Sequence, residues 1–204
     1  MRLKLLLATN NQGKVQEYKS LLQGLPYELV TPSELGIGIT VDEVGETLEE
    51  NAGLKARVFA AKSRLLTLAD DSGLEVDALG GEPGSLSARY AGEGATDSDR
   101  VNYLLSRLKD VPGEKRSACF KCVIVIAAPD GEVGSCFGEC RGFITFEPRG
   151  EQGFGYDPVF YLPELGKTMA ELTLAEKNEV SHRGQAARKA CRLLEGLRDG
   201  KYAC

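Results

Sequence analysis

The sequence lacks several features that mark large classes of protein. Its 204 residues carry a formal net charge of -5 at pH 7, so the excess of positive charge typical of duplex-binding proteins is missing. It has no apolar run long enough to cross a bilayer, and the run at residues 5–8 is too short for the core of a secretory signal. From these absences we expect no nucleic-acid partner, no membrane partner and a cytoplasmic location.

What is present is typical of a globular protein. Hydrophobic residues make up 42% of the chain and charged residues 27%, and the length suits a single domain spanning residues 1–204.

The six cysteines need an explanation other than disulfides, which a reducing compartment disfavours. The spacing of four of them, Cys119, Cys122, Cys136 and Cys140, resembles that of a four-thiolate zinc site. However, residues 118–126 have the composition of a strand, in which residues three apart point to opposite faces. We therefore favour structural cysteines, with a zinc-bearing interaction module as the alternative.

A polar turn follows the first apolar run. Residues 3–8 predict a short buried strand, and apolar residues recur at helical spacing from Lys14 onward, so the turn lies at the N-terminus of a helix. Such an end attracts anions because its backbone N–H groups are unpaired and its dipole is positive. The turn lacks the pattern of a P-loop, and an ordinary turn whose Asn and Gly satisfy the backbone is the alternative. The candidate phosphate ligands are Thr9, Asn10, Asn11, Gln12, Gly13 and Lys14.

Two adjacent carboxylates, Asp70 and Asp71, end a second apolar run. Buried carboxylates are costly unless they are paired, hydrogen-bonded or bound to a cation, and hard oxygen ligands suit Mg²⁺. Adjacent strand residues face opposite ways, so both can enter one site only if the chain bends. A solvated turn is the alternative. Glu43, in an acidic loop upstream, is by default a surface charge that suits a helix dipole.

Capping patterns predict two helices in the middle of the chain. Thr47 and Glu50 have capping-box spacing, so a helix should run from there to about Leu66, with Asn51 and Lys55 on one face. Another helix should follow the cap at residues 96–99. A hairpin should then pair residues 118–127 with 133–144. We place a second lobe around residues 118–144.

Residues 153–160 form a loop of glycine and aromatic residues that also contains Asp157. A base pocket needs a stacking face and an acceptor for ring N–H groups, and this loop offers both. The alternative is a turn that leads into a strand and whose aromatic side chains pack in the core.

The last polar cluster lies at residues 174–185. Ser181 is a natural N-cap, and Lys177, His182 and Arg183 gather around the start of the final helix. Positive charge at a helix start is unfavourable unless an anion lies there, which favours a binding role over plain surface charges.

Taken together, these clusters resemble the Ham1/RdgB family of inosine and xanthosine triphosphate pyrophosphatases. The resemblance extends from Leu3 to Leu197 and rests on six motifs in the same order. They are Thr9-x-Asn11-x-x-Lys14-x-x-Glu17, Glu50-Asn51-Ala52-x-x-Lys55-Ala56, Asp70-Asp71-Ser72-Gly73-Leu74, Gly80-Gly81-x-Pro83-Gly84, Phe154-Gly155-Tyr156-Asp157-Pro158 and Glu176-Lys177-x-x-x-Ser181-His182-Arg183.

The resemblance implies an elongated, two-lobed α/β fold, with a long twisted mixed sheet flanked by helices, a nucleotide cleft between the lobes, and a homodimer. It implies that Glu43 and Asp71 hold Mg²⁺, that Asp71 also accepts a proton, and that Ser72 contacts the substrate. The polar turn and Lys55 would contact the phosphates. Phe154, Gly155, Tyr156 and Asp157 would contact the base. Lys177, His182 and Arg183 would complete the contacts to the base and to the phosphates.

The expected reaction is Mg²⁺-dependent hydrolysis of non-canonical purine nucleoside triphosphates (ITP, dITP and XTP) to the monophosphate and pyrophosphate. Two alternatives use the same residues. One is a less selective nucleoside triphosphate pyrophosphatase, and the other is a nucleotide sensor that binds without turnover.

Overall fold

The structure is a computed structural model that describes residues 3–42 and 45–198. Its strands are β1 (Leu3–Leu7), β2 (Tyr27–Val30), β3 (Leu66–Val76), β4 (Pro83–Gly84), β5 (Ser117–Ala128), β6 (Gly131–Ile144), β7 (Phe160–Leu162) and β8 (Lys167–Thr168). Its α-helices are α1 (Gln12–Leu21), α2 (Leu48–Ser63), α3 (Asp97–Arg107), α4 (Leu174–Val180) and α5 (His182–Arg198).

Within the described residues, eight strands form one sheet in the order β2-β1-β3-β5-β6-β7-β8, with β4 paired to β3. β1 runs parallel to both β2 and β3, whereas β4, β7 and β8 pair antiparallel with their neighbours. The α/β class and the mixed sheet expected from the sequence are confirmed.

The helices begin where the sequence predicts them. A capping box of Thr47 and Glu50 starts α2, and the Thr96 side chain caps α3. α2 ends at Ser63 rather than near residue 66, because Arg64 adopts the left-handed conformation at φ 59° and stops the helix.

The chain forms two compact units. The first comprises the described residues up to Asp71, residues 122–138 and those from Arg183 onward, and the second comprises residues 72–121 and 139–182. Strands β3, β5 and β6 contribute to both units. The predicted hairpin is present as β5 and β6, with its middle in the first unit and its ends in the second.

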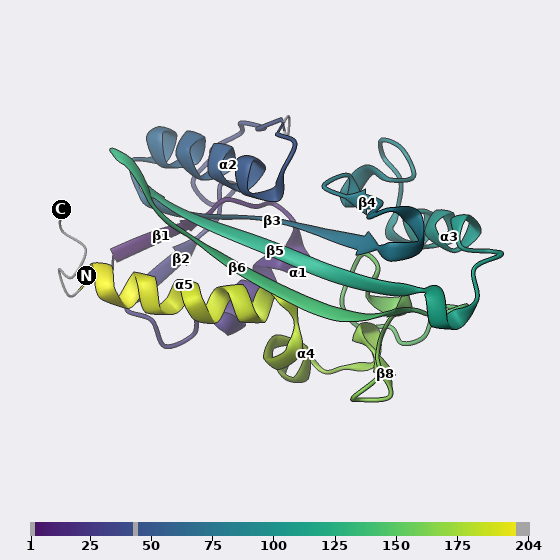
Figure 1. Cartoon of the computed structure of the whole chain (residues 1–204). Coiled ribbons are helices and arrows are strands. Elements are labelled where there is room, and N and C mark those ends of the chain that lie inside the picture. The colour runs from purple at the N-terminus through teal and green to yellow at the C-terminus, as the bar shows by residue number, and fades with distance from the viewer. Residues whose placement is uncertain (1–2, 43–44, 199–204) are drawn as a thin grey trace. The chain divides into compact units, whose positions relative to one another are not determined.

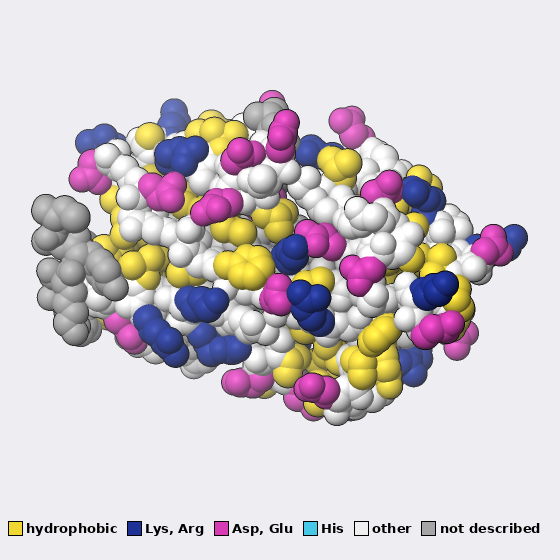
Figure 2. Space-filling model, viewed as in Figure 1, with side chains coloured by type: hydrophobic (Ala, Val, Ile, Leu, Met, Phe, Trp, Pro, Cys, Tyr) yellow, Lys and Arg dark blue, Asp and Glu magenta, His cyan; other side chains and the backbone are white. Residues whose placement is uncertain are grey.

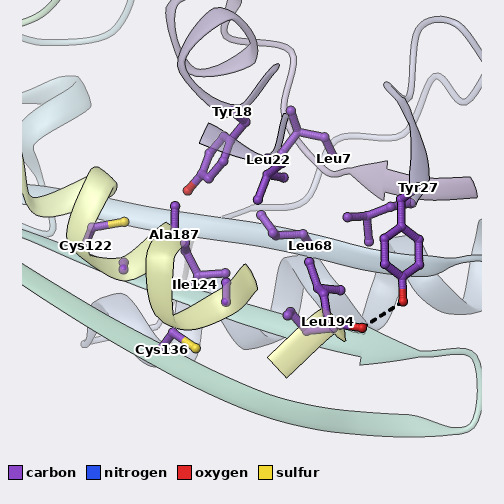
Figure 3. Close-up of a cluster of buried hydrophobic side chains, with 14 of the residues drawn as sticks. Leu7, Tyr18, Leu22, Tyr27, Leu68, Cys122, Ile124, Cys136, Ala187 and Leu194 are labelled. Atoms are coloured by element: carbon purple, nitrogen blue, oxygen red, sulfur yellow. Dashed lines mark hydrogen bonds between the residues drawn. The ribbon is translucent and has the colours of Figure 1, made fainter. Parts of the chain in front are cut away.

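In the first unit, helices cover both faces of the sheet. Alternate strand residues such as Leu7 and Ile124 pack with α1 and α5, and Figure 3 shows the side chains of this cluster. The residues between them, such as Leu6 and Val125, pack with α2. Figure 1 accordingly shows α2 on one face of the strands and α5 on the other.

In the second unit, α3 packs its Leu104 and Leu108 against a core that includes Leu74 and Phe160. β4 lies very close to β3 there. A Cβ added at Gly73 would be 2.3 Å from the carbonyl oxygen of Gly84, so only glycine permits this approach.

The described surface mixes both signs of charge. On the face shown in Figure 2, Lys and Arg side chains lie among Asp and Glu side chains rather than gathered in one area. In the described part of the chain, none of the helices combines the length and the apolar character needed to cross a bilayer.

Candidate active site

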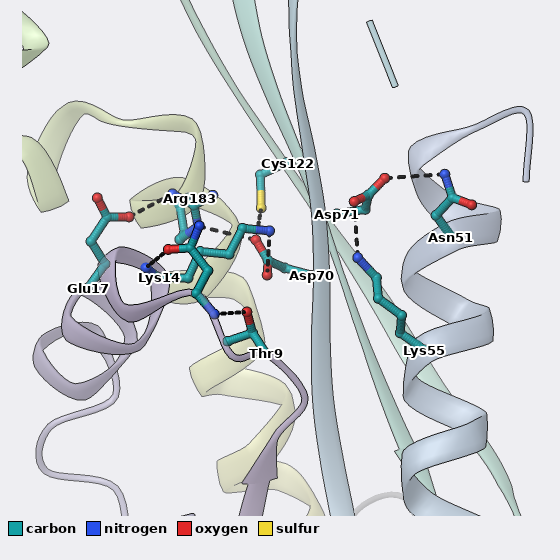
Figure 4. Close-up of polar contacts among 10 residues, drawn as sticks. Thr9, Lys14, Glu17, Asn51, Lys55, Asp70, Asp71, Cys122 and Arg183 are labelled. Carbon is teal, nitrogen blue, oxygen red and sulfur yellow. Dashed lines mark hydrogen bonds and ion pairs between the residues drawn. The ribbon is translucent and has the colours of Figure 1, made fainter. Parts of the chain in front are cut away.

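The two adjacent carboxylates lie in the middle of a strand. We predicted that the two carboxylates lie at the end of a buried strand, but β3 continues to Val76, and Asp70 and Asp71 are only 2% and 5% exposed. A solvated turn is therefore wrong for this segment. As the two-residue period of a strand requires, the side chains point to opposite faces, Asp70 toward α1 and Asp71 toward α2 (Figure 4).

Asp70 belongs to a buried ionic network. Its Oδ1 accepts a hydrogen bond from Lys14 Nζ at 3.0 Å, and its Oδ2 accepts one from Arg183 Nε at 3.2 Å. Arg183 also donates from a guanidinium nitrogen to Oε2 of Glu17 at 2.6 Å. Arg183 and Glu17 are 1% and 3% exposed, so this network is shielded from solvent.

The network shifts the pKa values of its members. Burial alone would raise the pKa of Asp70, but the positive charges of Lys14 and Arg183 outweigh burial and hold that pKa below its ordinary value. Burial would likewise lower the pKa of Arg183, but the carboxylates of Glu17 and Asp70 raise it. Asp70 and Arg183 are therefore both charged at neutral pH.

Asp71 has different partners, two of which lie on α2. Lys55 Nζ lies 3.0 Å from Asp71 Oδ1, and Asn51 Nδ2 donates to Asp71 Oδ2 at 3.4 Å. Asn51 and Lys55 are four residues apart, so the predicted shared helix face is confirmed and it presents both groups to one carboxylate.

The polar turn leads into α1 as predicted. Asn11 is the N-cap, and its Oδ1 accepts the Lys14 N–H at 3.1 Å, while Thr9 Oγ1 accepts the Asn11 N–H at 3.2 Å. These are the local contacts of an ordinary turn. At the same time residues 10–12 are exposed, and the first turn of α1 carries no carboxylate, so its positive dipole end is available to an anion.

In the second unit, the loop at residues 153–157 is held by a buried ion pair between Asp157 and Lys177, each 3% exposed. Asp157 Oδ2 also accepts the Phe154 N–H at 2.8 Å. Lys177 Nζ lies 4.8 Å from the centre of the Phe154 ring, close enough for a cation–π contact. A Cβ at Gly153 would be 2.1 Å from Asp157 Oδ2, so the loop can close on its carboxylate only because that residue is glycine.

The two rings of this loop have different surroundings. Tyr156 is 4% exposed, packs in the core of the second unit and donates from its hydroxyl to the carbonyl oxygen of Ser87 at 2.9 Å. Phe154 is only half-buried. Phe154 is thus the ring of the loop that keeps exposed surface, and Tyr156 anchors the loop.

The last cluster is divided between two helices rather than gathered at one helix start. Lys177 lies in the last turn of α4, a separate helix whose own cap, Thr173, we did not predict. Ser181 follows α4, and His182 begins α5. The His182 ring stacks on that of Phe120, with ring centres 4.7 Å apart and planes 10° apart.

With this geometry in view, comparison with known proteins is decisive. The model of the Ham1 family matches residues 5–193. The chain belongs to the Ham1 family. It is 50% identical over 199 residues to the dITP/XTP pyrophosphatase of Escherichia coli (strain K12), a match that covers 97% of this chain and 99% of that protein. The dITP/XTP pyrophosphatase of Bacillus subtilis (strain 168) is 45% identical over 190 residues, covering 93% of this chain and 96% of that protein.

Solved structures of Ham1 proteins have the same fold. A HAM1 protein from Coxiella burnetii matches with a TM-score of 0.85 and 41% identity, covering 95% of this chain and 98% of that one. The Ham1 protein of Staphylococcus aureus matches with a TM-score of 0.84 and 43% identity, covering 95% and 99%.

Two residues expected at the site complete the placement. Ser72 is half-buried and directly follows Asp71 in β3. Glu43 lies outside the described residues, so of the expected metal pair only Asp71 can be placed. Within residues 3–42 and 45–198, no three or more His, Cys, Asp or Glu side chains are grouped so as to hold a metal ion.

The cysteines of this Ham1 protein lie in different surroundings. Cys122 and Cys136 pack in the α1 and α5 cluster of the first unit, and Cys140 packs in the core of the second. Burial raises the pKa of the Cys119 thiol, and the nearby charge of Glu139 adds to this shift. The zinc-like spacing in the sequence does not correspond to a cluster in space, and these thiols pack within the fold.

Three contacts around the site were not expected from the sequence. They are Glu17 with Arg183, Phe120 with His182, and Asp70 with both Lys14 and Arg183. Glu17 and Asp70 stand within the family motifs, and that position was the available signal. Phe120 had no signal, because an aromatic residue in a strand is expected in any core.

Proposed function

We propose that this Ham1 protein hydrolyses non-canonical purine nucleoside triphosphates, such as dITP, ITP and XTP, to the monophosphate and pyrophosphate. The observation that supports this most strongly is the near-full-length identity to relatives named dITP/XTP pyrophosphatases. The site residues fit the proposal. Lys14, Lys55 and Asp71 offer cations and a carboxylate for the triphosphate and its metal ion, and Phe154 offers a ring for the base with the polar groups of Asp157 and Lys177 beside it.

In this proposal the triphosphate is bound by the polar turn, by two lysines and by Ser72. The exposed residues 10–12 and the dipole of α1 attract the anion. Lys14 and Lys55 supply positive charge, and each is already oriented by a carboxylate at 3.0 Å. Ser72 would add a hydroxyl contact.

Charge balance favours Mg²⁺ as a cofactor. Three cations, Lys14, Lys55 and Arg183, are matched by three carboxylates, those of Glu17, Asp70 and Asp71. A triphosphate adds about four negative charges to a cluster that is already neutral, so a further cation is needed. The Asp71 carboxylate is a hard oxygen donor of the kind that Mg²⁺ prefers, and Glu43 would be its second protein ligand. When bound, Mg²⁺ would neutralise phosphate charge and make a nearby water more acidic.

Asp71 is the proposed proton acceptor for the attacking water. Lys55 and Asn51 each contact one oxygen of its carboxylate, so the orientation of Asp71 is fixed from α2. A positioned general base of this kind contributes about 10² to 10⁴ to a rate. Asp70 is not suited to this role, because it is already bound to Lys14 and Arg183 on the opposite face of the strand.

The base would be bound by groups of the second unit. The partly exposed Phe154 ring would stack on the purine, and Gly155, Tyr156 and Asp157 complete its loop. Lys177 and His182 would donate toward the 6-oxo group of hypoxanthine or xanthine. Adenine has a donor at that position, so its binding would leave buried donors unpaired, which costs several kcal/mol.

Product analysis tests the proposal. The purified protein is incubated with Mg²⁺ and, separately, ITP, XTP, dITP, ATP and GTP, and monophosphate plus pyrophosphate are resolved from diphosphate plus phosphate. We expect the first pair of products, with ITP, dITP and XTP far ahead of ATP and GTP. A metal chelator should stop turnover, and added Mg²⁺ should restore it. Comparable rates on all five substrates would instead favour the unselective enzyme, and binding without turnover would favour the sensor.

We further propose that the protein is a cytoplasmic homodimer. The five free thiols of the described chain suit a reducing compartment. The dimer is inferred from the family resemblance. Light scattering coupled to size-exclusion chromatography tests it, and a mass equal to the 22.0 kDa of one chain would contradict it.

A further inference from the structure

A carboxylate outside the family motifs is bonded to the proposed base loop. Asp97, the first residue of α3, accepts the Gly155 N–H with its Oδ2 at 2.7 Å. That N–H belongs to the peptide group that joins Phe154 to Gly155. The bond therefore fixes the peptide plane next to the Cα of Phe154, the residue whose ring is proposed to stack on the purine.

Asp97 is itself held in place. Its other oxygen is paired with Arg100, one turn further along α3. Arg100 also donates to the carbonyl oxygens of Ala88 at 2.9 Å and Ala95 at 2.7 Å. Asp97 is thus oriented from one side by Arg100 and bonds the loop on the other.

Helix capping does not account for Asp97. The capping box of α3 is complete without it, because Thr96 accepts the Asp99 N–H at 3.1 Å and Asp99 accepts the Thr96 N–H at 2.9 Å. Asp97 is one of two carboxylates in the first turn of the helix, and it is the one that bonds Gly155.

The loop has a local need for such a bond. Gly155 has φ +63°, in the left-handed region, and a Cβ there would meet nothing within 4 Å, so the space beside its Cα is open. Tyr156 anchors the loop after Gly155, and Asp157 bonds the N–H of Phe154 before it. The bond to Asp97 fixes the peptide between these two anchors.

We propose that Asp97 is a positioning residue for base recognition, which acts by fixing the orientation of Phe154. This inference rests on the proposed function, since it assumes that the loop meets the purine. It predicts that Asp97 matters for the purine part of the substrate and not for the triphosphate part.

The test compares Asp97→Ala with Asp99→Ala, its matched control. Both variants remove one carboxylate from the first turn of α3, but only the first removes the bond to Gly155. We expect Asp97→Ala to raise the KM for dITP about 10-fold, the effect of losing one charge-assisted hydrogen bond, with a smaller change in kcat. Inhibition by inorganic tripolyphosphate, which has no base, should be unchanged. Asp97→Asn keeps an acceptor oxygen and should restore most of the affinity.

Calorimetric binding of dIMP makes the result independent of turnover. If the wild-type protein hydrolyses no dITP, the proposed function fails, and weaker binding of dIMP to Asp97→Ala than to Asp99→Ala still supports the inference. Any of three results would overturn the inference. The two variants could change the KM for dITP or the affinity for dIMP equally, or Asp97→Ala could weaken inhibition by tripolyphosphate in parallel. The third result is that the wild-type protein does not bind dIMP. If Asp97→Ala does not fold, Arg100→Gln, which weakens the orientation of Asp97, is compared with Asp99→Ala instead, and a dIMP affinity equal to that of Asp99→Ala overturns the inference.

Discussion

At the scale of residues, two neighbouring carboxylates have different surroundings and should have different functions. Asp70 is enclosed by Lys14 and Arg183 on the α1 face of β3, and Asp71 meets Lys55 and Asn51 on the other face. The difference follows from the alternation of side chains along a strand. One position in the sequence therefore separates a residue that stabilises the fold from one that is proposed to take part in the reaction.

Substituting each carboxylate by its amide separates the two functions. Asp71→Asn should lower kcat by about 10² to 10⁴, because the proton acceptor is lost, and should leave the melting temperature nearly unchanged. Asp70→Asn should lower the free energy of unfolding by about 3–5 kcal/mol, because Arg183 stays buried without one of its charge partners. Steady-state kinetics and urea denaturation of both variants give the answer, and an Asp71→Asn enzyme with wild-type turnover would contradict the assignment.

Three tyrosines should ionise late. Burial raises the pKa of Tyr90 to about 12, helped by its hydrogen bond to Glu82, and burial also raises the pKa of Tyr18 and Tyr156 above the ordinary value of 10.0. The folded state then holds these protons more tightly than the unfolded state. The stabilisation is complete below pH 10 and is lost as pH rises through 12.

Tyrosinate absorbance measures this effect without interference, because the chain has no tryptophan. Between pH 10 and 12, the folded protein should show less tyrosinate than the same protein in denaturant. The Tyr90→Phe variant should remove the step near pH 12. Equal titration curves for the folded and denatured protein would show that the three hydroxyls are not shielded.

At the scale of elements, α2 matters because it presents Asn51 and Lys55 to Asp71. Its start is fixed by the capping box of Thr47 and Glu50, in which each side chain bonds the backbone of the other. Thr47→Ala should therefore cost about 1 kcal/mol of unfolding free energy in urea denaturation and leave kcat close to that of the wild type. Glu50→Gln keeps an acceptor for the reciprocal bond and should cost less. A larger loss for Glu50→Gln than for Thr47→Ala would mean that the box is not what stabilises this helix end.

The elements also show how far the sequence alone could lead. The starts of α2 and α3 and the opposite faces of Asp70 and Asp71 were predicted, because capping and strand alternation are local rules. The continuation of β3 past Asp70 was not, because the pairing of its second half depends on distant residues such as Gly84.

The same limit applies to the site. The motifs named most of its residues, but they did not show which of them contact one another. Glu17 and Arg183 are 166 residues apart, and Asp97 and Gly155 are 58 apart. Such pairs are decided by tertiary packing, for which a spacing pattern carries no information.

At the scale of the whole molecule, the buried thiols report on both units. Cys122, Cys136 and Cys191 belong to the first unit, and Cys119 and Cys140 to the second. Burial raises the pKa of all five and brings those of Cys122 and Cys140 to about 12, so they should react slowly with thiol reagents at neutral pH.

Because β3, β5 and β6 pass through both units, we expect the units to unfold together. A Cys204→Ser variant leaves only the thiols of the described chain. In this variant the thiols of both units should become reactive toward a thiol reagent at the same urea concentration. That concentration should coincide with the loss of the circular dichroism signal. Exposure of Cys119 and Cys140 at a lower urea concentration than the other three would show that the second unit unfolds on its own.

The way the chain is divided also limits how this enzyme can acquire a new specificity. The four boundaries between the units, after residues 71, 121, 138 and 182, all fall inside β3, β5, β6 or α5. Neither unit is one continuous stretch of sequence, so recombination cannot exchange the proposed base loop and its supports as a single cassette. A protein built in this way changes its preference among nucleobases one substitution at a time, while every intermediate keeps the same continuous strands.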